Sequence, residues 1–269
     1  MDIKDIEKSL IKKYRKEIWG KFTSGLKDYD LIKEGDKIAV AISGGKDSLI
    51  LAKLLQELQK HGRDKIELEF ISMDPGFNDE NRKMLEENCK RLEIPVKIRE
   101  SRIFDIVDEI SKDQPCYLCA RMRRGFLYNF ARELGCNKLA LGHHFNDVIE
   151  TTMLNTFYAY EFKTMLPKIK AKNHQNMELI RPMYLVKEES IIRWKNYIDM
   201  EFMDCGCTVA CKVLGGKRKE IKNFINEYKK VHPDIDRSIF EAACNVNLDS
   251  IVGSRKDGIR KTYLEEKDD

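Results

Sequence analysis

Residues Ile38–Ser48 read IAVAISGGKDS, and this stretch decides the fold. The apolar run at 38–42 is typical of a strand buried inside a parallel sheet. Gly44 and Gly45 then permit a sharp turn before an apolar run at 49–55 that is typical of a helix. A glycine turn at a helix N-terminus directs backbone N–H groups and the positive end of the helix dipole at one point, which suits a phosphate. We therefore expect a nucleotide site here.

The side chains of this loop add charge and hydroxyl groups to the expected phosphate site. Lys46 neutralises polyphosphate charge, and the hydroxyls of Ser43 and Ser48 donate hydrogen bonds to it. Asp47 has two interpretations, a ligand of the Mg²⁺ that accompanies nucleotide phosphates or a simple helix N-cap. The loop is not a Walker A motif, because Val40 stands where that motif needs a glycine and Asp47 where it needs Ser or Thr.

Strand-like and helix-like segments alternate after residue 36. The pattern predicts strands at 37–42, 66–72, 94–99 and 138–142, and helices at 48–60, 79–92, 116–134 and 187–198. Such alternation predicts an α/β fold, a doubly wound parallel sheet of about five strands with helices on both faces. Helical extensions are expected at both ends. The chain is thereby divided into an extension at 1–35, a main domain at 36–200, and a region at 201–269 with a cysteine loop, a basic helix at 217–230 and a charged, frayed tail.

The loops that leave the carboxyl ends of these strands are expected to meet, because ligands of open α/β sheets bind there. These loops are residues 43–48, 73–76, 142–147 and 181–183. One of them opens the sequence GHHFNDVIET at 142–151 and places Asp147 at a helix start. Asp147 either ligates Mg²⁺ beside the nucleotide or caps the helix, with Glu150 closing a capping box.

Eight cysteines are present, and five of them fall in two clusters. Cys116 and Cys119 form a C-x-x-C pair at an expected helix start, and residues 205–211 read CGCTVAC. In a reducing compartment, clustered cysteines are more often metal ligands or redox groups than disulfides. A C-x-x-C pair suits an iron–sulfur cluster, Zn²⁺ or a dithiol couple. The isolated Cys89, Cys136 and Cys244 are expected to be buried as small apolar side chains.

Positive charge is concentrated in the last part of the chain. The net charge is +4, and residues 163–230 contain 15 Lys/Arg against 8 Asp/Glu. This basic segment, with the arginines at 121, 123 and 124, indicates either an RNA partner or a solvated basic face. No apolar run is long enough to span a bilayer, and the N-terminal residues lack a signal-peptide pattern. We expect a cytoplasmic protein with no membrane partner.

The order of these motifs resembles that of the tRNA 2-thiocytidine synthetases, which are PP-loop ATP pyrophosphatases with an adenine nucleotide alpha-hydrolase-like fold. The resemblance rests on SGGKDS at 43–48, C-x-x-C at 116–119 with RMRRG at 121–125, and LGHH at 141–144 with Asp147. It also includes LNTFY at 154–158, Pro167-Lys168, IRP at 180–182 and the cysteine loop. Asn146 departs from the family pattern, which has Asp at that position.

The resemblance implies an enzyme that uses ATP to adenylate the C2 oxygen of an anticodon-loop cytidine in tRNA and replaces that oxygen with sulfur. We expect catalytic roles for Lys46, Asp47 and Asp147. ATP, Mg²⁺ and a 4Fe–4S cluster are the expected cofactors, with Cys116 and Cys119 matching two cluster ligands. Cys207 is the expected third ligand, and Cys211 and Cys205 are the alternatives. The expected nucleotide-binding residues are Ser43, Gly44, Gly45, Lys46, Asp47, Ser48, Asp74, Gly142, His143 and His144.

The expected partners are tRNA, a cysteine desulfurase or another sulfur donor, and a second copy of the chain in a homodimer. Three other interpretations share parts of the pattern. A related PP-loop thiolase acting on a uridine or a small molecule has all the same motifs. A PP-loop ligase or amidotransferase with a structural zinc predicts a colourless protein. A redox sensor that binds nucleotide and RNA without modifying the RNA predicts no release of pyrophosphate.

Overall fold

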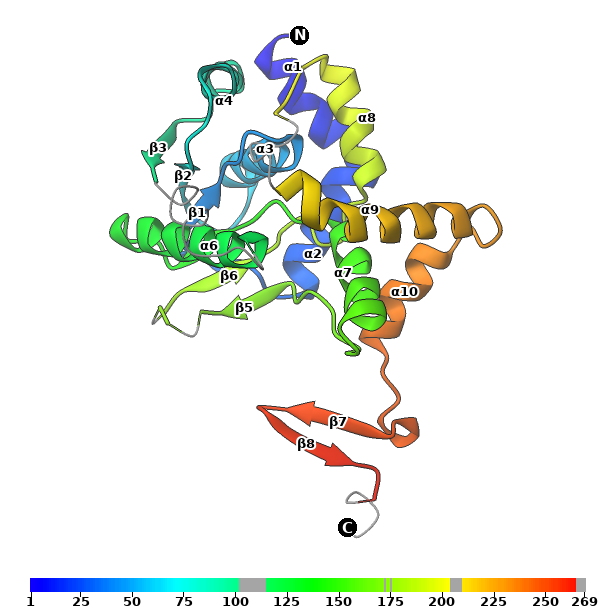
Figure 1. The fold of residues 1–269 in the computed structure, drawn as a ribbon. Coiled ribbons are helices and arrows are strands. Elements are labelled where there is room, and N and C mark those ends of the chain that lie inside the picture. The colour runs from blue at the N-terminus through cyan, green and yellow to red at the C-terminus, as the bar shows by residue number, and fades with distance from the viewer. Residues whose placement is uncertain (102–114, 172, 175, 204–209, 265–269) are drawn as a thin grey trace.

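The computed structural model describes residues 1–101, 115–171, 173–174, 176–203 and 210–264. One sheet organises most of them, with strands in the order β3-β2-β1-β4-β6-β5 (Figure 1). Neighbouring strands are parallel except for the edge pair β5 and β6, which is antiparallel. The strands are β1 Lys37–Ala41, β2 Glu67–Asp74, β3 Val96–Glu100, β4 Lys138–Ala140, β5 Lys168–Lys170 and β6 Glu178–Ile180.

Helices connect the strands and extend beyond them. Those between strands are α3 Lys46–His61, α4 Asp79–Arg91, α6 Pro115–Glu133 and α7 Phe145–Tyr158; after β6 come α8 Glu188–Ile198, α9 Ala210–Lys229 and α10 Ile235–Cys244. The N-terminal extension is helical throughout, with α1 Ile3–Lys8, the π-helical turns η1 Ser9–Lys13 and η2 Arg15–Trp19, and α2 Gly20–Asp28. The predicted doubly wound α/β fold is therefore confirmed.

The sheet is covered on both faces because successive side chains of a strand point to opposite sides. In β1, Ile38 and Val40 join a core with α3, α4, α8 and the N-terminal helices. Ala39 joins a second core on the other face, where α6 contributes Tyr128 and Phe130. Burial on both faces explains why the β1 sequence is continuously apolar rather than alternating.

The N-terminal extension packs into the main core. Lys53 on α3 is 1% exposed, and its ammonium lies 2.7 Å from Glu7 Oε1 and donates to the Leu92 carbonyl at 3.0 Å. The indole N–H of Trp194 on α8 donates to Ser9 Oγ at 3.1 Å. These buried polar contacts tie the first helices to α3 and α8, because leaving either partner unpaired would be costly.

Two features differ from the sequence-based expectation. The sheet has a sixth strand, the antiparallel β5, and the charged tail expected after residue 250 contains a hairpin of β7 Gly253–Lys256 and β8 Ile259–Thr262. Figure 1 shows this hairpin standing away from the sheet. Arg255 of the hairpin forms an ion pair with Glu161, which follows α7.

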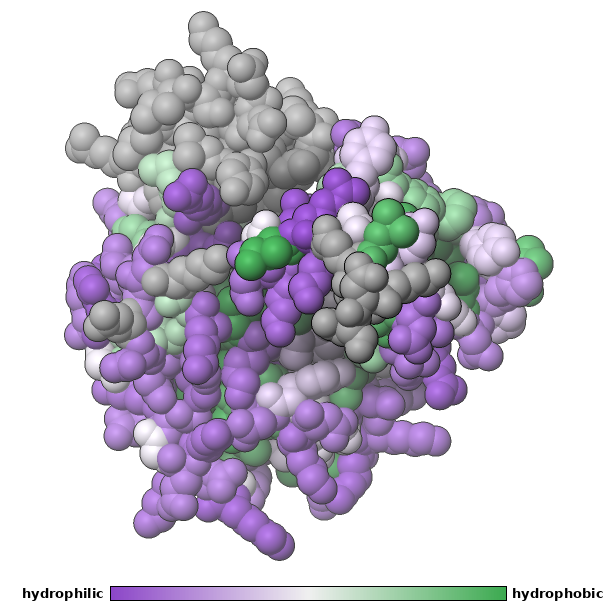
Figure 2. Space-filling model, turned by 90° about the horizontal axis from the view of Figure 1, so that it is seen from below, coloured by the Kyte–Doolittle hydropathy of each residue, from purple (hydrophilic) through white to green (hydrophobic). Residues whose placement is uncertain are grey.

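The molecular surface is largely hydrophilic on the face seen in Figure 2, where hydrophobic residues form small separate patches. Among the described residues, no helix combines the length and the apolar character needed to cross a membrane. Of the three isolated cysteines, Cys89 and Cys136 are buried as predicted. Cys244 is exposed, so the prediction of burial is wrong for that residue, which ends α10.

Candidate active site

The loop between β1 and α3 is preformed by its own hydrogen bonds. Ser48 Oγ accepts from the Ser43 N–H at 3.1 Å and donates to the Gly45 carbonyl at 2.9 Å. Gly44 has a φ of +84°, which favours glycine, and a Cβ built there would lie 2.3 Å from Met203 Sδ. Gly45 is the N-cap of α3, so the first N–H groups of that helix face the loop and form an anion site.

The loop after β4 lies against the start of α3, as predicted. A Cβ on Gly142 would be 3.0 Å from both the carbonyl carbon and the carbonyl oxygen of Asp47. Glycine suits this close approach, which brings the following histidines beside the phosphate loop. His144 is buried, and its Nε2 lies 3.9 Å from Asp47 Oδ1.

Asp147 holds the start of α7, but as the third helical residue rather than as the N-cap. The N-cap is His144, whose backbone N–H donates to Asp147 Oδ2 at 2.8 Å. The predicted capping box closed by Glu150 is therefore wrong. Glu150 instead accepts from Arg218 Nε at 2.7 Å, and Asp147 Oδ1 accepts from a terminal nitrogen of the same guanidinium.

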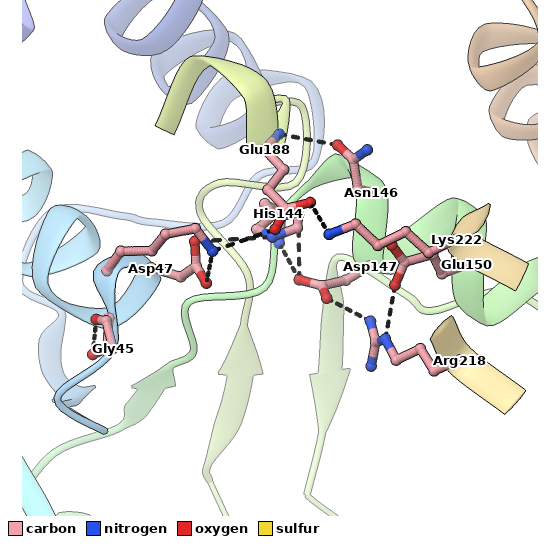
Figure 3. A network of polar contacts seen from close by, with 11 residues as sticks. Gly45, Asp47, His144, Asn146, Asp147, Glu150, Glu188, Arg218 and Lys222 are labelled. Carbon is pink, nitrogen blue, oxygen red and sulfur yellow. Dashed lines mark hydrogen bonds and ion pairs between the residues drawn. The ribbon is translucent and has the colours of Figure 1, made fainter. Parts of the chain in front are cut away.

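A chain of ion pairs joins four helices around this point (Figure 3). Glu188 at the start of α8 lies between two lysines, with Oε1 3.3 Å from the Lys46 ammonium and Oε2 2.6 Å from that of Lys222. Lys46 also contacts Asp47 Oδ2 at 3.0 Å. Lys222 belongs to α9, as does Arg218, so α9 contributes two cations to the site.

The electrostatics favour the charged forms of Asp147 and Lys46, whereas burial raises the pKa of Glu150. Burial raises the pKa of Asp147, but His144 and Arg218 lower it, and the resulting pKa lies below the usual value. Burial lowers the pKa of Lys46, but its two carboxylate neighbours raise it above the usual value. Burial lowers the pKa of His143 to about 4, so this imidazole is neutral near pH 7.

A cavity of about 280 Å³ adjoins the phosphate loop at the carboxyl ends of β1 and β2. Its lining is mostly apolar and consists of Ala41, Ile42, Ser43, Gly45, Met73, Pro75, Phe77, Arg123, Leu127 and Met203. Asp74 stabilises this part of the lining. It accepts hydrogen bonds from the backbone N–H groups of Gly76 at 2.9 Å and Phe77 at 2.7 Å, and it forms an ion pair with Arg82. Its oxygens are thus already engaged by protein donors.

Cysteines from both clusters lie near the starts of two helices that contact each other. Cys116 and Cys119 lie in the first turn of α6, as predicted, and Cys211 lies in the first turn of α9. Helices α6 and α9 are in contact. Cys205 and Cys207, the latter being the expected third cluster ligand, lie outside the described residues.

Several residues of the site were not predicted from the sequence. Arg218 and Lys222 belong to the basic helix that indicated an RNA partner, yet both face carboxylates of the site. Glu188 belongs to no motif that is recognisable in the sequence. Asn146, the departure from the family pattern, accepts a hydrogen bond from the Glu188 N–H at 3.0 Å through its side-chain carbonyl, which fixes the start of α8.

Comparison with known proteins identifies the family. A family model described as a PP-loop domain matches residues 14–205. A tRNA-cytidine(32) 2-sulfurtransferase of Polaromonas naphthalenivorans is 35% identical over 87% of this chain and 76% of its own length. One from Syntrophotalea carbinolica is 36% identical over 90% and 92%. In fold, the chain is similar to the U34-tRNA thiolase NcsA of Methanococcus maripaludis, solved with its 4Fe–4S cluster (TM-score 0.69, 24% identity, 88% and 80% covered). The chain belongs to the tRNA-cytidine(32) 2-sulfurtransferase family of PP-loop proteins.

Proposed function

We propose that this protein is an ATP-dependent tRNA sulfurtransferase that converts a cytidine of the anticodon loop to 2-thiocytidine. The observation that carries the proposal is the contact of the phosphate loop with His144, which in turn contacts Asp147. Relatives of the chain are named for the same activity. The sulfur would come from a cysteine desulfurase or another donor, and a tRNA substrate supports a cytoplasmic location.

The loop and the adjoining cavity fit an adenine nucleotide. The N-terminus of α3 and the ammonium of Lys46 would receive the phosphates, with the hydroxyls of Ser43 and Ser48 beside them. The apolar cavity next to Gly45 would take the adenosine, since ligand pockets are mostly apolar with a few polar groups that fix orientation. Asp74 would act indirectly, by holding the cavity wall.

Asp47 offers the best candidate ligand for Mg²⁺. Its Oδ1 is buried and accepts no hydrogen bond within the described part of the chain, whereas its Oδ2 faces Lys46. A buried carboxylate oxygen without a donor is costly, and a hard cation satisfies it. The described residues contain no cluster of three potential ligands, so Mg²⁺ would complete its shell with phosphate oxygens and water.

The cysteines fit an iron–sulfur cluster with one open position. Three thiolates, from Cys116, Cys119 and Cys207, would hold a 4Fe–4S cluster, which would supply a coordination position for the sulfur to be transferred. Support comes from the position of the first two at the start of α6 and from the contact of α6 with α9, the helix that follows the cysteine loop. Cys211 and Cys205 remain the alternatives for the third ligand.

The site residues would activate an unreactive carbonyl group. The C2 oxygen of cytidine attacks the α-phosphorus of ATP, and pyrophosphate leaves. Lys46 and the N-terminus of α3 stabilise the charge that develops on the departing phosphates. Sulfide then adds at C2, and the C2–O bond breaks, so that AMP leaves with the original oxygen. Holding sulfur beside the activated carbon makes this second step effectively unimolecular.

The test is anaerobic turnover with identified products. The reconstituted protein, unmodified tRNA, ATP, Mg²⁺ and sulfide are incubated, and the tRNA is digested for nucleoside mass spectrometry. We expect 2-thiocytidine in the wild-type reaction and none with Asp147→Asn. If 2-thiouridine appears instead, the substrate assignment is wrong. Absence of any thiolated nucleoside, despite a full iron–sulfur spectrum, refutes the proposal.

A further inference from the structure

A row of aromatic rings lies on the surface formed by α7 and α9. Phe157 of α7 packs edge-on against Phe224 of α9 with centroids 5.8 Å apart. Phe224 stacks with Tyr228 at 6.0 Å and an interplanar angle of 10°, and Tyr228 lies 4.8 Å from His232. We call these four residues the aromatic row. The last three are spaced four residues apart, so they occupy one face of α9 and its C-terminal turn.

The aromatic row is open to solvent. Phe157, Phe224 and Tyr228 are 48%, 44% and 43% exposed. Single exposed apolar residues are common on protein surfaces, but a continuous row of contacting rings is an unusual arrangement to leave in water. Such a row offers flat apolar faces to a flat ligand.

The loop after α7 displays another ring beside this surface. Tyr160 is 96% exposed, and its φ of +55° is unfavourable for a bulky residue. The loop is held in place by Asn155, whose carbonyl accepts from the Glu161 N–H at 3.2 Å and whose side-chain amide donates to the Lys163 carbonyl at 2.8 Å. A strained residue held outward by its surroundings points to a binding role.

Lysines lie beside the aromatic row, together with the carboxylate of Glu220, which contacts Tyr158. The Lys217 ammonium lies 4.8 Å from the centroid of the Tyr158 ring. Glu227 is paired with Lys230 at 2.7 Å, which removes a negative charge from this face. Lys217 lies seven residues before Phe224 and so shares its face of α9, and Lys163 in the loop after α7 is exposed. Rings combined with lysines match the two parts of single-stranded RNA, its bases and its phosphates.

The same two helices carry the candidate active site. Asp147 and Phe157 are ten residues apart on α7, which corresponds to about 15 Å along a helix. On α9, Arg218 faces the site and Phe224 faces the row. An RNA loop whose target base enters the site therefore has neighbouring nucleotides within reach of the rings.

We propose that the aromatic row and Tyr160 form a stacking surface for unpaired bases of the tRNA substrate that flank the target nucleotide, with Lys163 and Lys217 contacting their phosphates. This inference rests on the proposed function, because it takes the occupant to be tRNA. It adds the surface that positions the RNA, which the nucleotide and cysteine sites do not provide.

The experiment compares variants of exposed rings. Phe224→Ala and Tyr228→Ala are measured against Tyr197→Ala, which removes a ring of comparable exposure (37%) on another helix, α8, where its centroid lies 3.4 Å from Lys13 Nζ. Fluorescence anisotropy with labelled tRNA gives affinity over a range of salt concentrations. We expect about tenfold weaker binding for the two row variants at an unchanged salt slope, and no change for Tyr197→Ala. Lys217→Gln should reduce the slope by about 0.7, the value for one phosphate contact on a single strand.

A further variant is the control for misfolding. Tyr228→Trp keeps a ring in the row, so it should bind tRNA with wild-type affinity, and stacking of a base should quench its added fluorescence. Unchanged tRNA affinity in both alanine variants, while the wild type thiolates tRNA, overturns the stacking surface and leaves the proposed function intact. If the alanine variants sediment as monomers where the wild type is a dimer, and their RNA affinity is unchanged, the stacking surface is also overturned. The aromatic row then contacts a second copy of the chain. A wild-type protein that neither binds nor thiolates tRNA refutes the proposed function itself.

Discussion

Gly44→Ala tests whether the conformation of the phosphate loop carries nucleotide binding. Gly44 and Gly35 have nearly the same backbone conformation, with φ of +84° and +83°. A Cβ on Gly35 has no atom within 4 Å, whereas a Cβ on Gly44 lies 2.3 Å from Met203 Sδ and 3.2 Å from its Cγ. Gly35→Ala is therefore a matched control that isolates the backbone cost.

The expected losses of stability follow from the backbone conformation and from these two contacts. Alanine in the left-handed region costs about 1–2 kcal/mol, and this cost applies to both variants. Gly44→Ala must also displace Met203, which is buried, and such overpacking costs about 1–3 kcal/mol. We expect a loss of unfolding free energy of about 1–2 kcal/mol for Gly35→Ala and about 2–5 kcal/mol for Gly44→Ala. Adding Met203→Ala to Gly44→Ala should recover part of the difference, which a double-mutant cycle measures.

Two assays separate stability from binding. Urea unfolding gives the free energies, and calorimetric titration with a non-hydrolysable ATP analogue gives affinity well below the unfolding temperature. A loop displaced by a fraction of an ångström should weaken nucleotide binding about tenfold to hundredfold in Gly44→Ala, and Gly35→Ala should bind normally. If both variants are destabilised equally and both keep their nucleotide affinity, the conformation at Gly44 does not control nucleotide binding.

Three further predictions follow from the site and its supports. Cys116→Ala should abolish the visible iron–sulfur spectrum after anaerobic reconstitution while circular dichroism stays native; a full spectrum would remove this residue from the ligand set. Arg218→Met removes a cation that lowers the pKa of Asp147, so the acid limb of the pH–activity profile should move to higher pH; an unmoved limb would contradict a required Asp147 carboxylate. Because the folded-state pKa of His143 is lowered from 6.5 to about 4, the unfolded chain binds a proton that the folded protein does not between these values. Its contribution to stability should fall as pH falls below 6.5, and by NMR its imidazole should not titrate between pH 5 and 8.

The phosphate loop was predictable because its determinants are local. A buried strand, two glycines and a helix follow one another within 38–55, and the structure places them as β1, the loop and α3. The meeting of this loop with 142–147 was also predictable, since parallel strands end at the same edge. The close packing of Gly142 on the backbone of Asp47 is a contact that sequence spacing does not reveal.

The partners from α9 were not predictable, because they depend on how a distant helix docks. Arg218 is separated from Asp147 by 71 residues, and its helix has the basic composition of a surface that binds RNA. Only the packed structure shows that two of its cations face inward. Strand β5 was missed for a different reason: it is three residues long and reads Lys-Ile-Lys, which has too little apolar pattern to indicate a strand.

The proposed function requires that the loop at 43–48 use ATP to turn the C2 oxygen of cytidine into a leaving group. The most direct measurement uses tRNA whose target cytidine carries ¹⁸O at C2, with anaerobic turnover and mass spectrometry of the released AMP. The account predicts one ¹⁸O in AMP for each 2-thiocytidine formed. Thiolated tRNA accompanied by unlabelled AMP would contradict it.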